Sequence, residues 1–396
     1  MNKNSIEILT VGDIAPGDCS IPGFGIKSIS DKYGCDYLFS NIKKELENKD
    51  LLLGNLEGSL SQFSREKELR LCGLPEMAHT LRNIGFDVLS VANNHVLDHG
   101  PEIFKETISH CQQAGLMICG LRGNAEYYSQ PVIIEKKGLK VGILAYNWVS
   151  SESVDTAGEY IAQVYDGTVN YSWIRNSNIE ARNSTEIKNK NVIDDIRKIR
   201  NHVDVVILMP HWGYEWIIYP PYGLTIEARS FIDAGADLIV GSHPHVPQGI
   251  DAYNNKLIIY SLGDFLFDSA TRMYNHGMMI RCRLSPGAIN YYSLLFVERD
   301  NNYRPRIASL ETTIKYYKSV QKSSTACIKP DAKIFLNDDK IYKQYERIYN
   351  TLRLLKILKL CLMMLHRPFI IRIVGKKIFD LMKVIFMRIQ GKKVRW

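Results

Sequence analysis

The sequence predicts a layered α/β fold in which a sheet is buried on both of its faces. Through roughly the first 260 residues, short apolar segments alternate with segments that have helical periodicity. The apolar segments are continuous and do not alternate with polar residues, which is typical of strands covered on both sides. A chain of 396 residues also fits one large domain with an appendage better than a single minimal domain.

The individual elements follow from these two patterns. The expected strands are Ile6–Val11, Leu51–Leu53, Asp87–Val91, Val132–Ile134, Val141–Tyr146, Val203–Met209, Leu238–Val240, Leu257–Tyr260, Met278–Arg283 and Tyr291–Val297. The expected helices are Cys35–Asn48, Pro75–Ile84, Pro101–Ala114, Val192–Asn201 and Ile226–Ala234. Pro101 suits a first helical turn, because that position needs no backbone N–H.

Composition divides the chain into three parts. Residues 1–310 are expected to form the main domain, with an irregular insertion at 150–190 where polar residues, Gly and Asn dominate. Residues 311–337 are expected to be a connector. Residues 338–396 are expected to form a basic, amphipathic helical tail.

The positive charge of the chain is concentrated in this tail. The formal net charge is +8, but residues 351–396 contain twelve Lys or Arg and one acidic residue, Asp380, a local balance of +11. The remaining residues therefore sum to −3, and with no basic and aromatic platform the sequence does not favour nucleic acid as a partner. Lys and Arg that recur among apolar residues indicate a helix lying on an anionic membrane surface. A helical pair folded back onto the core is the alternative.

Cysteine usage and the N-terminal sequence favour a reducing compartment. The eight cysteines lie far apart and form no CxxC pair, so neither a disulfide framework nor a thiolate zinc site is expected. No apolar block typical of a signal peptide precedes the first expected strand. No uncharged apolar stretch reaches the ~18 residues needed to span a bilayer. We expect a cytoplasmic protein associated with the inner face of the cell membrane.

Side chains that can bind metals follow five of the expected strands. The clusters are Gly12–Asp18, Gly54–Gly58, Ala92–Gly100, Pro210–Glu215 and Gly241–His245. Ligands gather outside the carboxyl ends of strands in α/β sheets, so these clusters are expected to converge in one crevice. Carboxylates, imidazoles and an amide oxygen together suit Mn, Fe or Zn better than Ca or Mg. The sequence therefore predicts one or two divalent metal ions.

Each of these residues also has an ordinary structural interpretation. Asp13 alone could cap a turn, and Glu57 alone could be a solvated loop carboxylate. Asp98 could be the N-cap of the helix near Pro101 or could support His95 from behind. The metal hypothesis is favoured because five clusters agree.

The clusters also carry a family resemblance. Its residues are Gly12-Asp13, Asn55-Leu56-Glu57, Ala92-Asn93-Asn94-His95 with Asp98, His211-Trp212-Gly213 with Glu215, Gly241 with His243-Pro244-His245, and Tyr260-Ser261-Leu262-Gly263-Asp264-Phe265. In order and spacing this set resembles the CapA/PGA_cap family of bacterial capsule and poly-γ-glutamate synthesis, over residues 6–270. The resemblance implies a calcineurin-like metallophosphoesterase core, a four-layer α/β/β/α sandwich and a dinuclear metal site.

The resemblance also implies roles for single residues. The implied metal ligands are Asp13, Glu57, Asn94, His211, His243 and His245, with Glu57 in the bridging position. The implied catalytic pair is His95, as proton donor to the leaving group, and Asp98. Three positions depart from the pattern. Glu57 is one methylene longer than the aspartate that usually stands at the bridging position, which shifts the bridge. Ala15 stands where the superfamily has a histidine, and Asp264 stands where the family usually has asparagine, so Asp264 could add a carboxylate near the metals.

Three functions are compatible with these residues. The leading hypothesis is a metal-dependent hydrolase acting on a phosphoester or related bond in an anionic surface polymer or its precursor. The alternative from another class is a non-catalytic accessory subunit of a membrane complex that makes or exports poly-γ-glutamate or polysaccharide. A γ-glutamyl hydrolase or a partner of a ligase is a third alternative.

Overall fold

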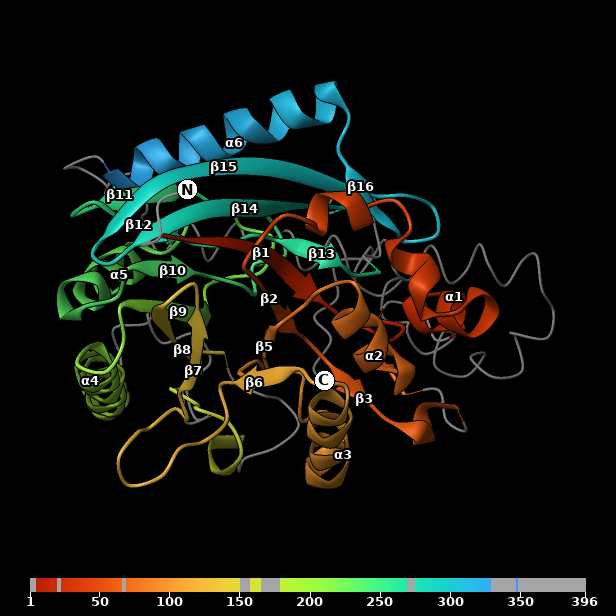
Figure 1. The fold of residues 1–396 in the computed structure, drawn as a ribbon, viewed down its shortest axis with the longest axis horizontal. Helices are drawn as coiled ribbons and strands as arrows, with labels where there is room; N and C mark the ends of the chain where they lie inside the picture. The colour runs from red at the N-terminus through yellow and green to blue at the C-terminus, as the bar shows by residue number, and fades with distance from the viewer. Residues whose placement is uncertain are drawn as a thin grey trace, which may run out of the picture. The chain divides into compact units, whose positions relative to one another are not determined.

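The computed structural model describes residues 5–19, 23–65, 69–149, 157–164, 179–268 and 275–328, together with Arg347. The chain divides into two compact units, Met1–Tyr345 and Glu346–Trp396, and the first contains both large sheets. This unit is a mixed α/β structure with one sheet of eight strands, one of six and a small sheet of two, as drawn in Figure 1. The described residues contain six α-helices.

The first large sheet has the order β16-β15-β14-β1-β2-β5-β6, with β13 paired to β1. Its strands are β1 (Ile6–Ile14), β2 (Leu51–Leu56), β5 (Val88–Ser90), β6 (Met117–Cys119), β13 (Asp264–Leu266), β14 (His276–Ser285), β15 (Ala288–Arg299) and β16 (Pro305–Ile307). Strands β1, β2, β5 and β6 are parallel, so their carboxyl ends share one edge. At that edge Asp13 lies opposite Asn55 of β2 and Asp264 of β13.

The second large sheet has the order β11-β12-β10-β9-β8-β7. Its strands are β7 (Val132–Lys136), β8 (Leu139–Asn147), β9 (Val205–His211), β10 (Leu238–Val240), β11 (Ile250–Tyr253) and β12 (Lys256–Ile259). Strands β8, β9, β10 and β12 are parallel, which again brings their carboxyl ends together. The two-stranded sheet pairs β3 (Ser59–Leu60) with β4 (Cys72–Gly73).

Helices cover the sheets, and three apolar cores result. The helices are α1 (Ile26–Tyr33), α2 (Glu76–Asn83), α3 (Gly100–Gln113), α4 (Ile179–Arg200), α5 (Tyr222–Ala234) and α6 (Leu310–Ile328). Leu52 of β2 packs in a core with Phe104 of α3, whereas its neighbour Leu53 packs in a core shared with Ile143 of the other sheet. A third core joins the second sheet to α4 and α5, which lie together in Figure 1. Both faces of β2 are therefore buried, as its continuous apolar sequence predicts.

All ten expected strands and four of the five expected helices are present, with shifted ends. The expected helix Cys35–Asn48 is wrong, because two short 3-10 helices, η1 (Cys35–Phe39) and η2 (Lys43–Leu46), replace it. Between them Ile42 adopts φ −127° and ψ −8°, outside the helical region. The apolar side chains of this segment are still buried in the core. Their spacing along the sequence therefore suits two short 3-10 helices as well as one continuous helix.

Two expectations about connecting segments are also changed. Helix α6 (Leu310–Ile328) fills most of the expected connector and lies beside β15 in Figure 1. Tyr316 of this helix packs on Phe296 of β15. Helix α4 begins at Ile179, inside the stretch expected to be irregular. The domain boundaries themselves stay a prediction, and almost all of the basic tail lies outside the described residues. Within the described part of the chain, no helix is both long and apolar enough to cross a membrane.

Candidate metal centre

The two sheets present potential metal ligands at the carboxyl ends of their parallel strands. Three overlapping groups each have ligand atoms within 4.8 Å of one another. The groups are Glu57–His243–His245, Asp13–His245–Asp264 and Asp13–Glu57–His211. All their members are buried. The strand-end clusters found in the sequence therefore do converge.

Asp13 is fixed by polar contacts from both sheets. Its Oδ1 accepts a hydrogen bond from Asn55 Nδ2 at 2.8 Å, and its Oδ2 accepts one from the backbone N–H of His243 at 3.2 Å. Burial raises the pKa of Asp13 to about 6, against the opposing attraction of His245. The backbone of β1 approaches that of Gly263 closely here, since a Cβ on Gly12 would lie 1.8 Å from the carbonyl oxygen of Gly263. Glycine at position 12 therefore permits the approach that places Asp13 beside β13.

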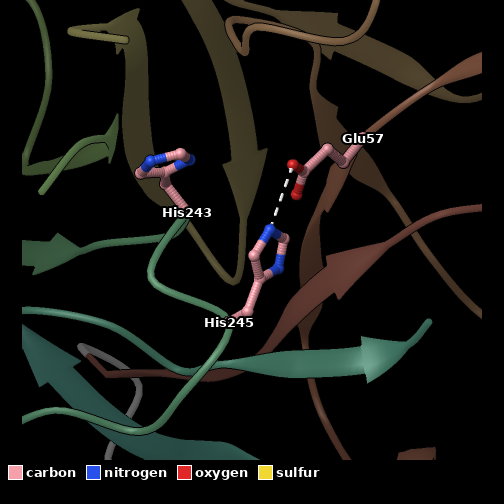
Figure 2. Close-up of side chains that lie close together, drawn as sticks. All are labelled: Glu57, His243 and His245. Atoms are coloured by element: carbon pink, nitrogen blue, oxygen red, sulfur yellow. Dashed lines mark ion pairs between the residues drawn. The ribbon is translucent and has the colours of Figure 1, made fainter. Parts of the chain in front are cut away.

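Glu57 and His243 are buried, and their polar side-chain atoms receive no hydrogen bond from the part of the chain that the structure describes. Among the described residues, neither carboxylate oxygen of Glu57 and neither ring nitrogen of His243 makes a hydrogen bond. Glu57 Oε1 lies 3.8 Å from His245 Nε2 and 3.9 Å from His211 Nε2, beyond hydrogen-bonding distance. Figure 2 shows the carboxylate facing the His245 ring, with His243 to one side. Burial, reinforced by Asp13, raises the pKa of Glu57 well above its ordinary value.

His211 closes β9 and contacts Asn94 directly. The distance from His211 Nε2 to Asn94 Oδ1 is 2.8 Å, and the distance from His211 Nδ1 to Ser242 Oγ is 2.9 Å. With the amide oxygen of Asn94 as acceptor, His211 Nε2 is the donor in this metal-free arrangement. Burial and the neighbouring His243 lower the pKa of His211 well below 6.5. The imidazole is therefore neutral, which is the form that binds metals.

The loop after β10 holds its two histidines in a strained backbone. His243 has φ 95° and His245 has φ 56°, both in the left-handed region that residues with a side chain rarely adopt. Their ring centroids are 6.0 Å apart, and the His243 ring is 4.8 Å from that of His211. Strain of this kind concentrates at functional sites, where the surrounding structure maintains it.

His95 and Asp98 form a hydrogen-bonded pair beside this centre. His95 Nδ1 lies 2.8 Å from Asp98 Oδ2, and the two side chains are 28% and 22% exposed. The N-cap of α3 is His99, which makes no side-chain capping bond, so the contact with His95 favours the supporting role for Asp98. Asn93 fixes the loop, because its Oδ1 accepts hydrogen bonds from the backbone N–H groups of His95 and Val96.

The structure thus brings the eight predicted residues to one edge, although their roles stay predictions. Residues missed in the sequence are Asn55, Asn93, Ser242 and Arg299, which contact these side chains or hold their loops. The first three stand inside the quoted motifs, so a signal existed. Arg299 has none, because its contact with Asp264 is visible only in the fold.

Ala15 packs with Leu71 and Phe267 in a small apolar cluster.

Comparison with known proteins places these residues in a family. Residues 7–269 match the family described as "Bacterial capsule synthesis protein PGA_cap". The chain belongs to this family. A calcineurin-like core is consistent with that membership.

Two curated relatives come from Bacillus. The chain is 30% identical to "Capsule biosynthesis protein CapA" of Bacillus anthracis over 272 residues, which are 67% of this chain and 61% of that protein. It is 28% identical to "PGA biosynthesis protein CapA" of Bacillus subtilis (strain 168) over 263 residues, 65% of this chain and 62% of that protein. The PGA_cap chain thus spans about three fifths of the length of these relatives.

A third relative is named for an accessory role. Over 233 residues the chain is 26% identical to a "Probable polyglutamine synthesis accessory protein" of Mycobacterium tuberculosis (strain CDC 1551 / Oshkosh). That match covers 56% of this chain and 57% of the relative. These names connect the three relatives to the synthesis of capsule, PGA and polyglutamine.

Proposed function

We propose that this PGA_cap protein binds one or two divalent metal ions and acts as a metal-dependent hydrolase in surface-polymer synthesis. The observation that carries the proposal is the pair Glu57 and His243, whose four polar side-chain atoms are buried without hydrogen bonds from described residues. Buried polar groups left unpaired are costly and rare in native proteins. An ion held between these side chains would remove that cost.

The donor set fits such an ion. Neutral imidazoles with carboxylates suit Mn, Fe or Zn. We assign Asp13, Glu57 and His245 to one ion and Asn94, His211 and His243, with Glu57 shared, to a second. Glu57 supports this assignment, because its Oε1 lies 3.8 Å from His245 Nε2 and 3.9 Å from His211 Nε2. When bound, the ions would supply Lewis acidity and a hydroxide near neutral pH.

His95 is assigned the proton transfer to the leaving group. The hydrogen bond from Nδ1 to Asp98 leaves Nε2 as the ring nitrogen that can face a substrate. Both side chains are partly exposed, unlike the buried ligands, so a substrate can reach them. Asp98 orients the ring through this hydrogen bond.

The substrate, location and finer fold belong to the same proposal. We assign as substrate a phosphoester or related bond in an anionic surface polymer or in its precursor. The protein would act at the inner face of the cell membrane, with peripheral contact through residues 338–396 and without nucleic acid. The core shared by the two large sheets supports a four-layer α/β/β/α sandwich.

A second candidate function is that of a non-catalytic accessory subunit. Ala15 favours it, because an apolar side chain packed with Leu71 and Phe267 replaces a histidine ligand implied for the superfamily. The name of the mycobacterial relative points in the same direction. In that function the metal centre would be structural.

Metal-dependent turnover separates the two candidates. Wild-type protein loaded with Mn, Fe or Zn is assayed with generic phosphomonoesters and phosphodiesters, beside His95→Ala and His110→Ala. His110 is the matched control, since it pairs with Glu106 at 3.3 Å and both side chains are exposed to a similar degree, 26% and 20%. The hydrolase predicts turnover that His95→Ala abolishes while retaining metal and that His110→Ala leaves unchanged. Bound metal without turnover of any ester supports the accessory subunit.

A further inference from the structure

Asp264 is a buried residue whose carboxylate contacts two side chains, those of His245 and Arg299. Its Oδ1 lies 2.8 Å from His245 Nδ1, and its Oδ2 lies 3.2 Å from Arg299 Nη2. Arg299 Nη1 also donates to the backbone carbonyl of Asp264 at 2.9 Å. Asp264 is 1% exposed and Arg299 is 3% exposed. One arginine therefore holds this residue at both its side chain and its backbone.

We propose that Asp264 and Arg299 are positioning residues that turn His245 Nε2 toward Glu57, and that Asp264 is not itself a metal ligand. The proposal rests on the metal centre proposed above and specifies which ring nitrogen of His245 serves it. It corrects the sequence-based hypothesis that Asp264 adds a carboxylate to the metals.

The ring nitrogens of His245 have different partners. A carboxylate can only accept a hydrogen bond, so Nδ1 donates to Asp264 and carries the proton. Nε2 is then the nitrogen available to a metal, and it is the atom that lies 3.8 Å from Glu57 Oε1 (Figure 2). Using Nδ1 as ligand would instead require the group Asp13–His245–Asp264 and would break the 2.8 Å hydrogen bond. The geometry favours Nε2, because metal-binding histidines usually donate their other N–H to a carboxylate or carbonyl.

Arg299 disfavours metal ligation by Asp264. Both carboxylate oxygens are engaged, one by His245 and the other by the guanidinium. An arginine keeps its positive charge at any ordinary pH, so a cation bound to the same carboxylate would be repelled by it. The guanidinium holds the carboxylate of Asp264 in the position where its other oxygen contacts His245.

The strands around Asp264 make this support rigid. Asp264 opens β13 and pairs with Asp13 of β1. On its other side, a Cβ on Gly277 of β14 would lie 2.0 Å from the carbonyl oxygen of Asp264. Arg299 ends β15. A support built on four strands can hold an imidazole to the accuracy that metal binding requires.

Metal affinity in a set of variants tests the proposal. The probe is Zn²⁺ alone, titrated into metal-free protein by calorimetry. Asp264→Ala should weaken Zn²⁺ binding about 10- to 100-fold, the effect usual for residues that orient a ligand. Asp264→Asn should stay within about threefold of wild type, because its amide oxygen can still accept from Nδ1.

Removing the arginine gives effects of opposite sign under the two alternatives. If Asp264 is a positioning residue, Arg299→Met should weaken Zn²⁺ binding, since the carboxylate loses its anchor. If Asp264 is a ligand, the same change removes a competing cation and should strengthen binding, which would overturn the proposal. Asp264→Asn combined with Arg299→Met buries no uncompensated charge, and it should bind more tightly than Arg299→Met alone. The matched control is Arg229→Met, which removes the 2.8 Å ion pair with buried Asp251 and should leave affinity unchanged.

Nitrogen NMR of His245 supplies a readout independent of affinity and turnover. In ¹¹³Cd-loaded protein the proposal predicts metal coupling to Nε2 and a proton on Nδ1, whereas coupling to Nδ1 would contradict it. Failure to bind any metal would refute the proposed function without deciding this point. Against the effect of burial, Asp264 and Glu57 raise the pKa of His245 well above 6.5, so metal-free protein is then measured at an alkaline pH where the ring is neutral. There His245 should carry its proton on Nδ1 in wild type and lose that preference in Asp264→Ala. A proton on Nε2 in wild type would overturn the proposal.

Discussion

Asp237 and Glu57 are both buried carboxylates at strand ends, but their surroundings are opposite. Asp237 precedes β10 and accepts hydrogen bonds from the backbone N–H of Val206 at 2.9 Å and from the side chains of Arg200 and Lys256. Glu57 follows β2 and, within the described ranges, receives none. Both are almost fully buried, at 1% and 0% exposure. Asp237, at the amino end of β10, thus has hydrogen-bond partners for its carboxylate. Glu57, at the carboxyl end of β2, has none among the described residues.

This difference separates structural from functional burial. Two cations around Asp237 balance its charge, so the carboxylate ties α4, β9 and β12 together. Glu57 lies in potential ligand groups with Asp13, His211, His243 and His245. Burial lowers the pKa of His211 and His243 well below 6.5, whereas Asp264 and Glu57, against the effect of burial, raise the pKa of His245 above it. Two of the three imidazoles around Glu57 are therefore neutral, which is the form that binds a metal ion, and His245 is the one beside it that can carry a positive charge.

Glu227 of α5 sharpens the comparison. It is also buried without hydrogen bonds that meet strict geometry among the described residues, but it belongs to none of the groups that could hold a metal. Burial raises its pKa to about 8, with Trp148 and Asn189 opposing the shift. Lack of a partner alone therefore does not define the candidate centre. Convergence with His243 and His245 does.

The largest predicted effect concerns Glu227→Gln. The folded-state pKa of about 8 exceeds the ordinary 4.5, so between these values the unfolded chain has lost a proton that the folded chain keeps. Wild-type stability should therefore fall as pH rises through this window and level off above it. Glutamine has no such loss, so the variant should gain up to about 5 kcal/mol on wild type between pH 4.5 and 8. Urea unfolding at three pH values measures this, and parallel pH profiles would contradict it.

The next effect is that of Asp237→Ala. Removing the carboxylate leaves Arg200 and Lys256 without their anion and frees the N–H of Val206, which should lower the free energy of unfolding by about 3–5 kcal/mol. Metal content should not change, because Asp237 lies at the amino end of its strand. Denaturant titration and elemental analysis measure the two quantities. Loss of metal by this variant would contradict the proposal that Asp237 has a structural role and that only the carboxyl ends of the strands bind metal.

Metal removal should lower the stability of the folded protein through the site around Glu57. At a free metal concentration of about 100 times Kd, the bound ion should raise the unfolding free energy of wild type by about 2.7 kcal/mol relative to chelated protein. Glu57→Gln should show little of this stabilisation, since an amide replaces the bridging carboxylate. Thermal unfolding with and without chelator measures the difference. An equal metal-dependent shift in both proteins would exclude Glu57 as a ligand.

The smallest predicted effect has an unusual sign. In metal-free protein at pH 8, Glu57→Gln should raise the unfolding free energy by about 1–2 kcal/mol, because burial raises the pKa of Glu57 well above its ordinary value and glutamine has no such cost. Asp237→Asn, the matched change at a satisfied carboxylate, should lower it. Chemical denaturation of the two chelated variants measures both signs. Destabilisation by both substitutions would show that Glu57 is a structural residue like Asp237.

The sequence predicted those features that depend on local pattern. Continuous apolar segments predicted β2 and β9, and the polar residues after them predicted the positions of Glu57 and His211. The helix expected at Cys35–Asn48 failed because its apolar spacing fits two short turns as well as one helix. Arg299 could not be predicted, since only the pairing of β13, β14 and β15 in one sheet brings it to Asp264. Long-range pairing of this kind leaves no local trace.

Elemental analysis of the purified protein tests the central claim most directly. Wild type is compared with His243→Ala, His211→Ala and the control His276→Ala, a histidine of β14 whose Nδ1 contacts Tyr316 Oη instead of the site. We predict near-stoichiometric Mn, Fe or Zn in wild type and control, and loss of that metal in both site variants. Absence of metal in wild type even after reconstitution, or equal metal in all four proteins, would contradict a metal centre at this edge.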